Sequence, residues 1–292
     1  MRIGAFELAE PLPDLRNPHA FALLRPWVDV GSVGSLTIAV LEGQFKAQPL
    51  GKLIEPGNFF DFTRYRPVIR LIEGHREVRV PNSFINYAKG PHDNDLIFFH
   101  LLEPHMLGEA YAESILKVLR KLGISRYCLV GAMYDAVPHT KPLIVTGTAS
   151  GSAESALRTL GVRSSDYEGP TTIAILTSLE APKYDIEVMT LIVHLPQYSQ
   201  LDEDYAGRLR LLEVICSLYD FPLDLEQSKH EADEQYAKLS LAAEKQPGVK
   251  EIIQRLEAYY EARISKAEEE TPKLSPEVER FLREIDKSFG QG

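Results

Sequence analysis

Two apolar runs separated by a segment with helical spacing set the fold class of this 292-residue chain. The runs cover Leu96–Leu102 and residues 127–131, and each has the length of a strand that is buried on both faces. Between them, apolar residues recur every three or four positions from Tyr111 to Leu122, and Gly123 closes the segment. A strand, a helix and a second buried strand form a βαβ unit, so the sequence predicts an α/β fold with a mostly parallel sheet.

Further segments with strand or helix patterns surround this unit. Strands are expected at residues 49–54, 67–72, 77–80 and 186–194, and a hairpin turn is expected around Gly74. Helices are expected near residues 153–160, 172–179 and 201–218, with the rest of 134–170 as loop. Residues 1–26 contain four prolines and are expected to form an extended lead-in.

A pair of glycines lies where a strand at residues 27–30 is expected to turn into the first helix. Gly31 and Gly34 permit a tight turn and close packing, and Ser32 is a candidate helix cap. Backbone N–H groups at such a turn can also hold an anion. The stretch has neither the three glycines of a dinucleotide fingerprint nor the Gly-Lys-Ser/Thr of a P-loop. We therefore favour a packing turn and leave ligand binding as the alternative.

Several polar residues follow the expected parallel strands directly. Glu103 and His105 come after Leu96–Leu102, and His139 and Thr140 lie in a proline-bounded loop after residues 127–131. Open α/β sheets bind ligands at the carboxyl ends of their strands, so these positions predict the lining of a cleft. For His139, which could act as a base or a phosphate donor, we slightly favour the alternative of a rigid loop in which the ring is hydrogen-bonded for structure. The candidate cleft or ligand-binding residues are Gly31, Ser32, Gly34, Glu103, His105, His139 and Thr140.

Neither a metal centre nor a catalytic nucleophile is predicted. His100 and Glu103 would point to opposite faces of a strand, and Pro104 prevents a helical pair of ligands with His105. No Gly-x-Ser-x-Gly motif is present, so no catalytic residue is assigned and no cofactor is expected.

Charged residues dominate after Leu225, where the chain has the pattern of amphipathic helices interrupted at Pro247 and Pro272. A last helix is expected to begin at Ser275. Each amphipathic helix needs a surface to cover, so we expect residues 225–292 to form a helical appendage on an α/β domain of residues 1–224. This appendage is a candidate arm for binding a protein partner.

Composition limits the partners and the compartment. The net charge of −10, from 42 acidic and 32 basic residues, disfavours nucleic acid as a partner. No apolar run approaches the roughly 20 residues of a membrane span, and no signal peptide is recognisable. The two cysteines lie in apolar surroundings, as expected of buried thiols in a reducing compartment. We therefore expect a cytoplasmic protein.

Five motifs recur in order over roughly residues 20–240, namely Val28-Asp29-Val30-Gly31-Ser32-Val33-Gly34, Leu102-Glu103-Pro104, Val137-Pro138-His139-Thr140-Lys141-Pro142, Tyr167-Glu168-Gly169-Pro170-Thr171 and His194-Leu195-Pro196-Gln197-Tyr198. Together they resemble the PAC2 family, named for proteasome assembly chaperones, and in particular a prokaryotic branch of it. The resemblance implies a three-layer α/β/α sandwich similar to nucleoside phosphorylases, a homo-oligomer that is often a trimer, and a helical C-terminal appendage. The family has no agreed catalytic residues, so none is transferred to this chain.

Two functions are compatible with these features. The first is a non-enzymatic oligomeric scaffold or assembly-chaperone-like protein, which would bind a partner through the helices after Leu225. The alternative is a small-molecule binder or enzyme of hydrolase or phosphorylase type, acting on nucleosides or phosphate and working with an ATP-grasp ligase-like partner. The alternative predicts a deep pocket where Gly31, Glu103, His105 and His139 meet.

Overall fold

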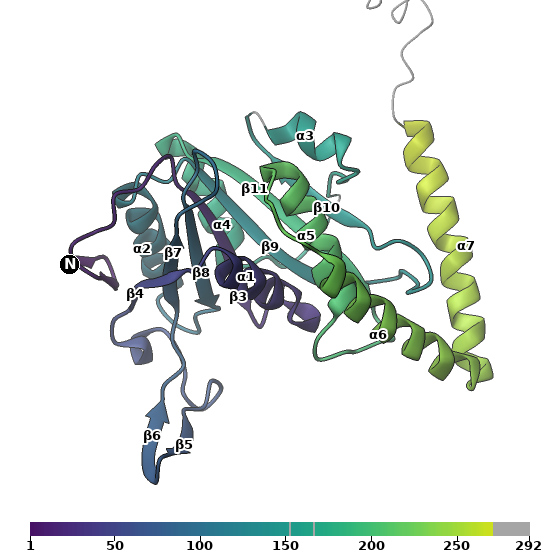
Figure 1. Ribbon diagram of the computed structural model, residues 1–292, viewed down its shortest axis with the longest axis horizontal. Helices are drawn as coiled ribbons and strands as arrows, with labels where there is room; N and C mark the ends of the chain where they lie inside the picture. Colours follow the sequence, from purple (N-terminus) through teal and green to yellow (C-terminus); the bar gives the residue numbers. More distant parts are fainter. Residues whose placement is uncertain (152, 166, 271–292) are drawn as a thin grey trace, which may run out of the picture.

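A computed structural model describes residues 1–151, 153–165 and 167–270, and a nine-stranded mixed sheet forms its centre (Figure 1). The strand order is β1-β2-β4-β7-β8-β3-β9-β11-β10. The strands are β1 (Arg2–Ile3), β2 (Phe6–Leu8), β3 (His19–Arg25), β4 (Gln48–Leu53), β7 (Phe84–Ala88), β8 (Leu96–Leu102), β9 (Arg126–Asp135), β10 (Val145–Ala149) and β11 (Glu187–Pro196). The four central strands β8, β3, β9 and β11 are parallel to one another.

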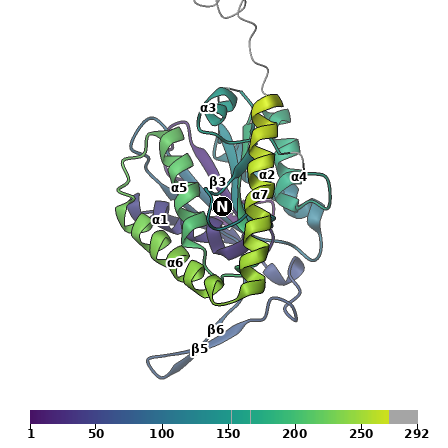
Figure 2. The same ribbon diagram turned by 90° about the vertical axis from the view of Figure 1, so that its right-hand side faces the viewer.

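Helices cover both faces of the sheet and make three layers, as expected. One face carries α1 (Val33–Gln44) and α5 (Tyr205–Tyr219), and the other carries α2 (Gly108–Lys121) and α4 (Ile173–Glu180), as Figure 2 shows. The short helix α3 (Ala153–Thr159) packs beside β10. Three 3-10 turns complete the chain up to Tyr219: η1 (Val30–Ser32), η2 (Pro56–Asn58) and η3 (Ala181–Tyr184).

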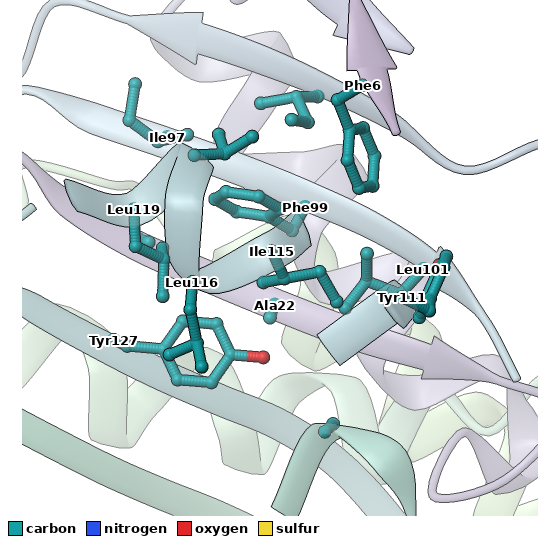
Figure 3. Packing of buried hydrophobic residues seen from close by; sticks show 14 of the residues in the cluster. Phe6, Ala22, Ile97, Phe99, Leu101, Tyr111, Ile115, Leu116, Leu119 and Tyr127 are labelled. Atoms are coloured by element: carbon teal, nitrogen blue, oxygen red, sulfur yellow. The ribbon is translucent and has the colours of Figure 1, made fainter. Parts of the chain in front are cut away.

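Strand β8 shows why its sequence is almost entirely apolar. Phe99 packs with Ile115 and Leu119 of α2 on one side of the sheet (Figure 3). The neighbouring Phe98 belongs to the opposite core, with Ile38 of α1. Successive side chains of a strand point to opposite faces, so a strand between two helical layers is apolar on both faces. The polar exception is His100, whose Nε2 lies 2.8 Å from the Glu42 carboxylate of α1.

Most of the expected elements are confirmed, including the hairpin of β5 (Val68–Ile72) and β6 (His75–Arg79). The strand expected at residues 27–30 was placed wrongly. The strand that precedes the first helix is β3, His19–Arg25, which lies inside the expected lead-in. Residues 27–30 form a turn in which Asp29 alone makes a bridge, to Ala132. The prolines at 18 and 26 bound this strand rather than preventing it, because neither interrupts its hydrogen-bond ladder.

Strand β10 was also missed, because Val145–Ala149 was expected to be loop. It pairs antiparallel with β11 at the margin of the sheet. The segment is only five residues long and contains Gly147, so it has little of the pattern of a buried strand.

The last two helices form an arm that crosses the carboxyl ends of β9 and β11 (Figures 1 and 2). Helix α6 (Glu226–Glu244) continues from α5, and α7 (Pro247–Glu270) turns back after Pro247. The expected helix break at Pro247 is therefore confirmed. The helix expected from Ser275 lies outside the described residues. We call α6 and α7 the C-terminal arm.

We expect Gly131→Ala to destabilise the fold strongly. A Cβ atom at Gly131 would lie 1.8 Å from the carbonyl oxygen of Val28, which accepts the N–H of Ala132. Relieving this overlap means moving buried backbone, at a cost of about 3 kcal/mol of unfolding free energy. Gly43→Ala is the matched control, since α1 leaves open space there and alanine favours a helix by about 0.5–1 kcal/mol. Urea denaturation of both variants measures the difference, and equal stabilities would contradict this account.

Candidate functional site: two polar clusters at the carboxyl ends of the strands

The glycine turn after β3 packs against the start of α5. Gly31 has φ +58°, and a Cβ atom there would lie 2.8 Å from Cβ of Asp204. The carbonyl oxygen of Gly31 accepts the N–H of Asp204 at 2.8 Å. Ser32 donates through Oγ to the carbonyl oxygen of Asp202 at 2.9 Å. The turn thus joins the first helix to the fifth.

The N-terminus of α1 is capped by Asp29 rather than by Ser32. The Asp29 carboxylate accepts the N–H of Ser35 at 3.0 Å and its hydroxyl at 2.6 Å. Burial raises the pKa of Asp29, while the bonds from Ser35 and the N–H of Gly34 act in the opposite direction. Glycine at position 34 leaves room for this carboxylate, because a Cβ atom there would lie 3.0 Å from Asp29 Oδ1. The anion at this helix end is therefore the chain's own carboxylate.

His139 lies in a buried polar cluster beneath α6. Its backbone N–H donates to the Tyr198 hydroxyl at 2.8 Å, and its ring Nδ1 lies 2.5 Å from the same oxygen. Its Nε2 lies 2.9 Å from Oγ of Ser240 on α6. The ring of Tyr236 lies 5.8 Å from the His139 ring, and its hydroxyl donates to Asp204. We call these residues, namely His139, Tyr198, Asp204, Tyr236 and Ser240, the arm cluster.

The arm cluster joins two of the predicted site residues, Gly31 and His139, through Asp204 and Tyr236. Burial lowers the pKa of His139 and raises that of Asp204. The Asp204 carboxylate nevertheless keeps strong partners, since it also accepts the N–H of Gly207 at 2.7 Å. Each of these groups is bonded within the protein, so the cluster in this form seats a helix and leaves no open cleft.

The loop around Thr140 holds the second helix of the arm. The Thr140 hydroxyl donates to Glu257, and Lys141 pairs with Glu261 at 2.8 Å. The hydroxyl of Tyr260 donates to the carbonyl oxygen of Pro142 at 2.9 Å. Exposed ion pairs of this kind contribute less than about 1 kcal/mol each, so they direct the position of α7 more than they stabilise it.

A chain of hydrogen bonds that the sequence analysis missed ties α7 to the sheet. Arg263 contacts Asp135 at 2.6 Å, Asp135 contacts Nδ1 of His194 at 2.7 Å, and Nε2 of His194 lies 2.8 Å from the Thr146 hydroxyl. The bonds from His194 and Arg263 hold the pKa of Asp135 far below its ordinary value. The ionised carboxylate can only accept, so a neutral His194 carries its proton on Nδ1 and accepts from Thr146.

A hydroxyl that donates to a histidine, which in turn donates to a carboxylate, is also the arrangement of a catalytic triad. The surroundings of this arrangement differ from those of an active site. Thr146 and His194 are both buried, in β10 and β11, and each is only 5% exposed. This series of hydrogen bonds therefore anchors the arm to the sheet.

Glu103 lies in a different place, at the carboxyl end of β8. One carboxylate oxygen accepts the N–H of Ile173, the first residue of α4, at 3.3 Å. The other is buried and has no hydrogen-bond partner among the described residues. The Tyr65 hydroxyl donates to the carbonyl oxygen of Glu103 at 3.1 Å. Burial raises the pKa of Glu103.

His105 borders an open hollow of about 450 Å³ and is linked to Glu103 through Tyr65. Its Nδ1 accepts the N–H of Asp61 at 3.2 Å, and its ring meets that of Tyr65 edge-on at 4.5 Å. Arg64 and Met106 also line this hollow. The structure thus places Glu103 and His105 together and Gly31 and His139 together, in two separate clusters.

The described residues contain no group of three or more His, Cys, Asp or Glu side chains placed to hold a metal ion. Within the same part of the chain, no helix has the length and apolar character needed to cross a membrane.

The sequence pattern of the PAC2 family matches residues 23–242, three quarters of the chain. This chain belongs to the PAC2 family. The match includes the glycine turn, Glu103, His139 and the arm as far as Ala242. A search of curated proteins finds no match.

Several solved structures share the fold. A Mycobacterium tuberculosis protein of unknown function is 22% identical, with a TM-score of 0.79, and 92% of each chain is covered. A proteasome-assembly chaperone homologue from the same organism is 24% identical, with a TM-score of 0.71, covering 80% of this chain and 99% of that one. An archaeal proteasome activator from Pyrococcus furiosus is 16% identical, with a TM-score of 0.65, covering 82% and 99%. At these identities the likeness concerns the fold alone.

Proposed function

We propose that this PAC2 protein is a non-enzymatic, homo-oligomeric scaffold of the assembly-chaperone type. The observation that carries the proposal is the β5–β6 hairpin, which projects from the body of the molecule (Figure 1). Every residue of its two strands is exposed. A two-stranded hairpin alone in water is marginally stable, so this one needs a surface to cover.

One face of the hairpin is mostly apolar. Ile69 pairs with Val78 and Leu71 pairs with Arg76, so three apolar side chains and one arginine share this face. Ile69 is 63% exposed and Leu71 is 72% exposed. The neighbouring Val80 is exposed as well. A contiguous apolar patch rimmed by polar groups is typical of a protein–protein interface.

Charge favours a second copy of the chain as the partner of the hairpin. Residues 64–80 contain five arginines and two glutamates, a net charge of +3, so the remaining residues carry −13. The hairpin of one copy is therefore attracted to the acidic body of another. A closed ring such as a trimer would use each hairpin once.

We further propose that the outer side of the C-terminal arm binds the protein whose assembly is assisted. Leu241 of α6 and Ile252 and Tyr259 of α7 are about half exposed, whereas Ile253 and Tyr260 of α7 are buried. Two relatives by fold are described as a proteasome-assembly chaperone homologue and a proteasome activator. Subunits of a proteasome are therefore the partner class to test first.

A small-molecule binder remains the second candidate, favoured by polar atoms near the ends of β3 and β8. Arg25 Nε, Glu103 Oε2 and Thr172 Oγ1 are buried without a hydrogen-bond partner among the described residues. We expect inorganic phosphate and nucleosides to leave the melting temperature unchanged if the protein is only a scaffold. A rise in melting temperature that Glu103→Gln abolishes would establish the second candidate instead.

Leu71→Asp is expected to dissociate the oligomer. A carboxylate on the apolar face of the hairpin has to lose its hydration when the interface forms, and it faces an acidic body. We expect the variant to sediment as a 32.8 kDa monomer in analytical ultracentrifugation. Leu179→Asp is the control, since Leu179 is 67% exposed on α4, away from the hairpin. A monomeric wild-type protein would refute the oligomeric part of the proposal.

Leu241→Glu combined with Ile252→Glu is expected to weaken partner binding without changing the fold. Burying two carboxylates in an apolar contact costs several kcal/mol, which corresponds to more than a hundredfold in dissociation constant. Biolayer interferometry with isolated proteasome α subunits measures this, with Leu107→Glu as an exposed control elsewhere. Binding that is equally tight for both variants would show that the arm is not the contact.

A further inference from the structure

The hydrogen-bond pattern around His139 fits only one protonation state of its ring. The Ser240 hydroxyl donates to the carbonyl oxygen of Tyr236 at 3.0 Å, so its oxygen must accept from Nε2 of His139 at 2.9 Å. The Tyr198 oxygen accepts the backbone N–H of His139, and its own hydrogen is directed to Nδ1 at 2.5 Å. Nδ1 is therefore an acceptor, and the bonded ring is neutral with its proton on Nε2.

No carboxylate is bonded to this ring among the described residues. The titratable or charged groups on the elements packed around it are Tyr198 after β11, Tyr236 on α6, Glu257 on α7, Lys141 on its own loop, and Asp204 beyond Tyr236. Glu257 accepts from Thr140, Lys141 pairs with Glu261, and Asp204 receives the Tyr236 hydroxyl. A proton on Nδ1 would leave a buried cation with a displaced tyrosine hydrogen and no bonded counter-ion.

We propose that His139 is a proton-operated latch for the C-terminal arm: when its ring is protonated, α6 separates from the loop at residues 137–142 and α7 follows. The two helices are linked, since α7 turns back directly after α6 and holds the same loop through Glu257, Tyr260 and Glu261. This property concerns the arm itself and does not depend on the proposed function.

The direction of the effect follows from the two states of His139. In the docked arm burial lowers its pKa, whereas in the released arm it returns to about 6.5. Docking is therefore at full strength above pH 6.5. It weakens by up to about tenfold per pH unit as the pH falls toward the docked value.

Two neighbouring groups do not drive this release. Asp204 has a raised pKa in the docked arm, so its protonation on acidification opposes release. The pKa of Asp135 lies far below its ordinary value in the docked arm, so this carboxylate stays ionised between pH 7.5 and pH 5.0 and does not contribute to release. The latch is thus specific to His139.

Release would uncover an apolar surface at the carboxyl ends of the strands. Val137 and Ile144 are buried beneath Tyr260 and Ile264 of α7. The Arg263 contact to Asp135 would open as well. An acid-released arm would therefore present a surface that the docked form keeps from any partner.

Hydrogen–deuterium exchange of the full chain at pH 7.5 and pH 5.0, corrected for intrinsic rates, tests the latch. We expect the protection of α6 and α7 to fall at pH 5.0, by up to about thirtyfold, while β8 and α2 keep theirs. In His139→Gln the amide can donate to Ser240 and accept from Tyr198 without gaining a charge, so the arm should stay protected. His92→Gln, an exposed histidine bonded to the Asp220 carbonyl, should behave as the wild type.

A second variant decides the matter if His139→Gln fails to dock its arm at pH 7.5. Tyr198→Phe removes the hydroxyl that donates to Nδ1, so a proton on that nitrogen no longer displaces a tyrosine hydrogen. The pKa of His139 in the docked arm then lies closer to its value in the released arm, and the loss of protection between pH 7.5 and pH 5.0 should be smaller than in the wild type. The proposal is overturned if the wild-type arm stays protected at pH 5.0. It is equally overturned if His139→Gln releases its arm as the wild type does, or if Tyr198→Phe loses as much protection at pH 5.0 as the wild type.

Discussion

The structure depends on finding partners for polar groups at the carboxyl ends of its parallel strands. A buried polar group without a hydrogen bond costs free energy of the same order as the bond it lacks, so each strand end needs water, a ligand or another part of the chain. At β9 and β11 the C-terminal arm meets this need. Asp135 and His194 bond to each other and to Arg263, and His139 bonds to Ser240. The arm thus supplies hydrogen-bond partners to polar groups that the sheet itself leaves without them.

The strand ends of β3 and β8 are completed differently. Glu103 has one carboxylate oxygen on the N-terminus of α4 and the other buried without a described partner. His105 borders an open hollow there. The C-terminal arm thus covers the carboxyl ends of β9 and β11. At the carboxyl ends of β3 and β8, in contrast, some buried polar atoms have no hydrogen-bond partner among the described residues. The polar atoms near Glu103 that lack a described partner offer a ligand more hydrogen-bonding sites than the bonded groups around His139.

Sequence patterns predicted the features that depend on neighbouring residues. The apolar run of β8, the spacing of α2 and the hairpin around Gly74 are all local, and they appear where expected. Long-range pairings were out of reach. His194 lies 59 positions from Asp135, and Arg263 lies 128 positions from it, so no spacing connects them. The cap at Asp29 had a local signal, an acidic residue just before the helix, but Ser32 competed with it as the nearer candidate. His139 was correctly recognised as a polar residue at a strand end, while its role in seating α6 required knowing where α6 lies.

The positions of the two proposed contact surfaces have a consequence for assembly. The β5–β6 hairpin and the C-terminal arm project from different ends of the molecule (Figure 1). A copy held by the hairpin therefore need not obstruct the arm, and both surfaces can be occupied at once. The charges are separated in the same way, with excess arginine at the hairpin and an acidic remainder. Self-association through the basic end leaves the arm free to take a partner by apolar contact. An assembly factor needs this separation, because it must hold its own form while binding and releasing another chain.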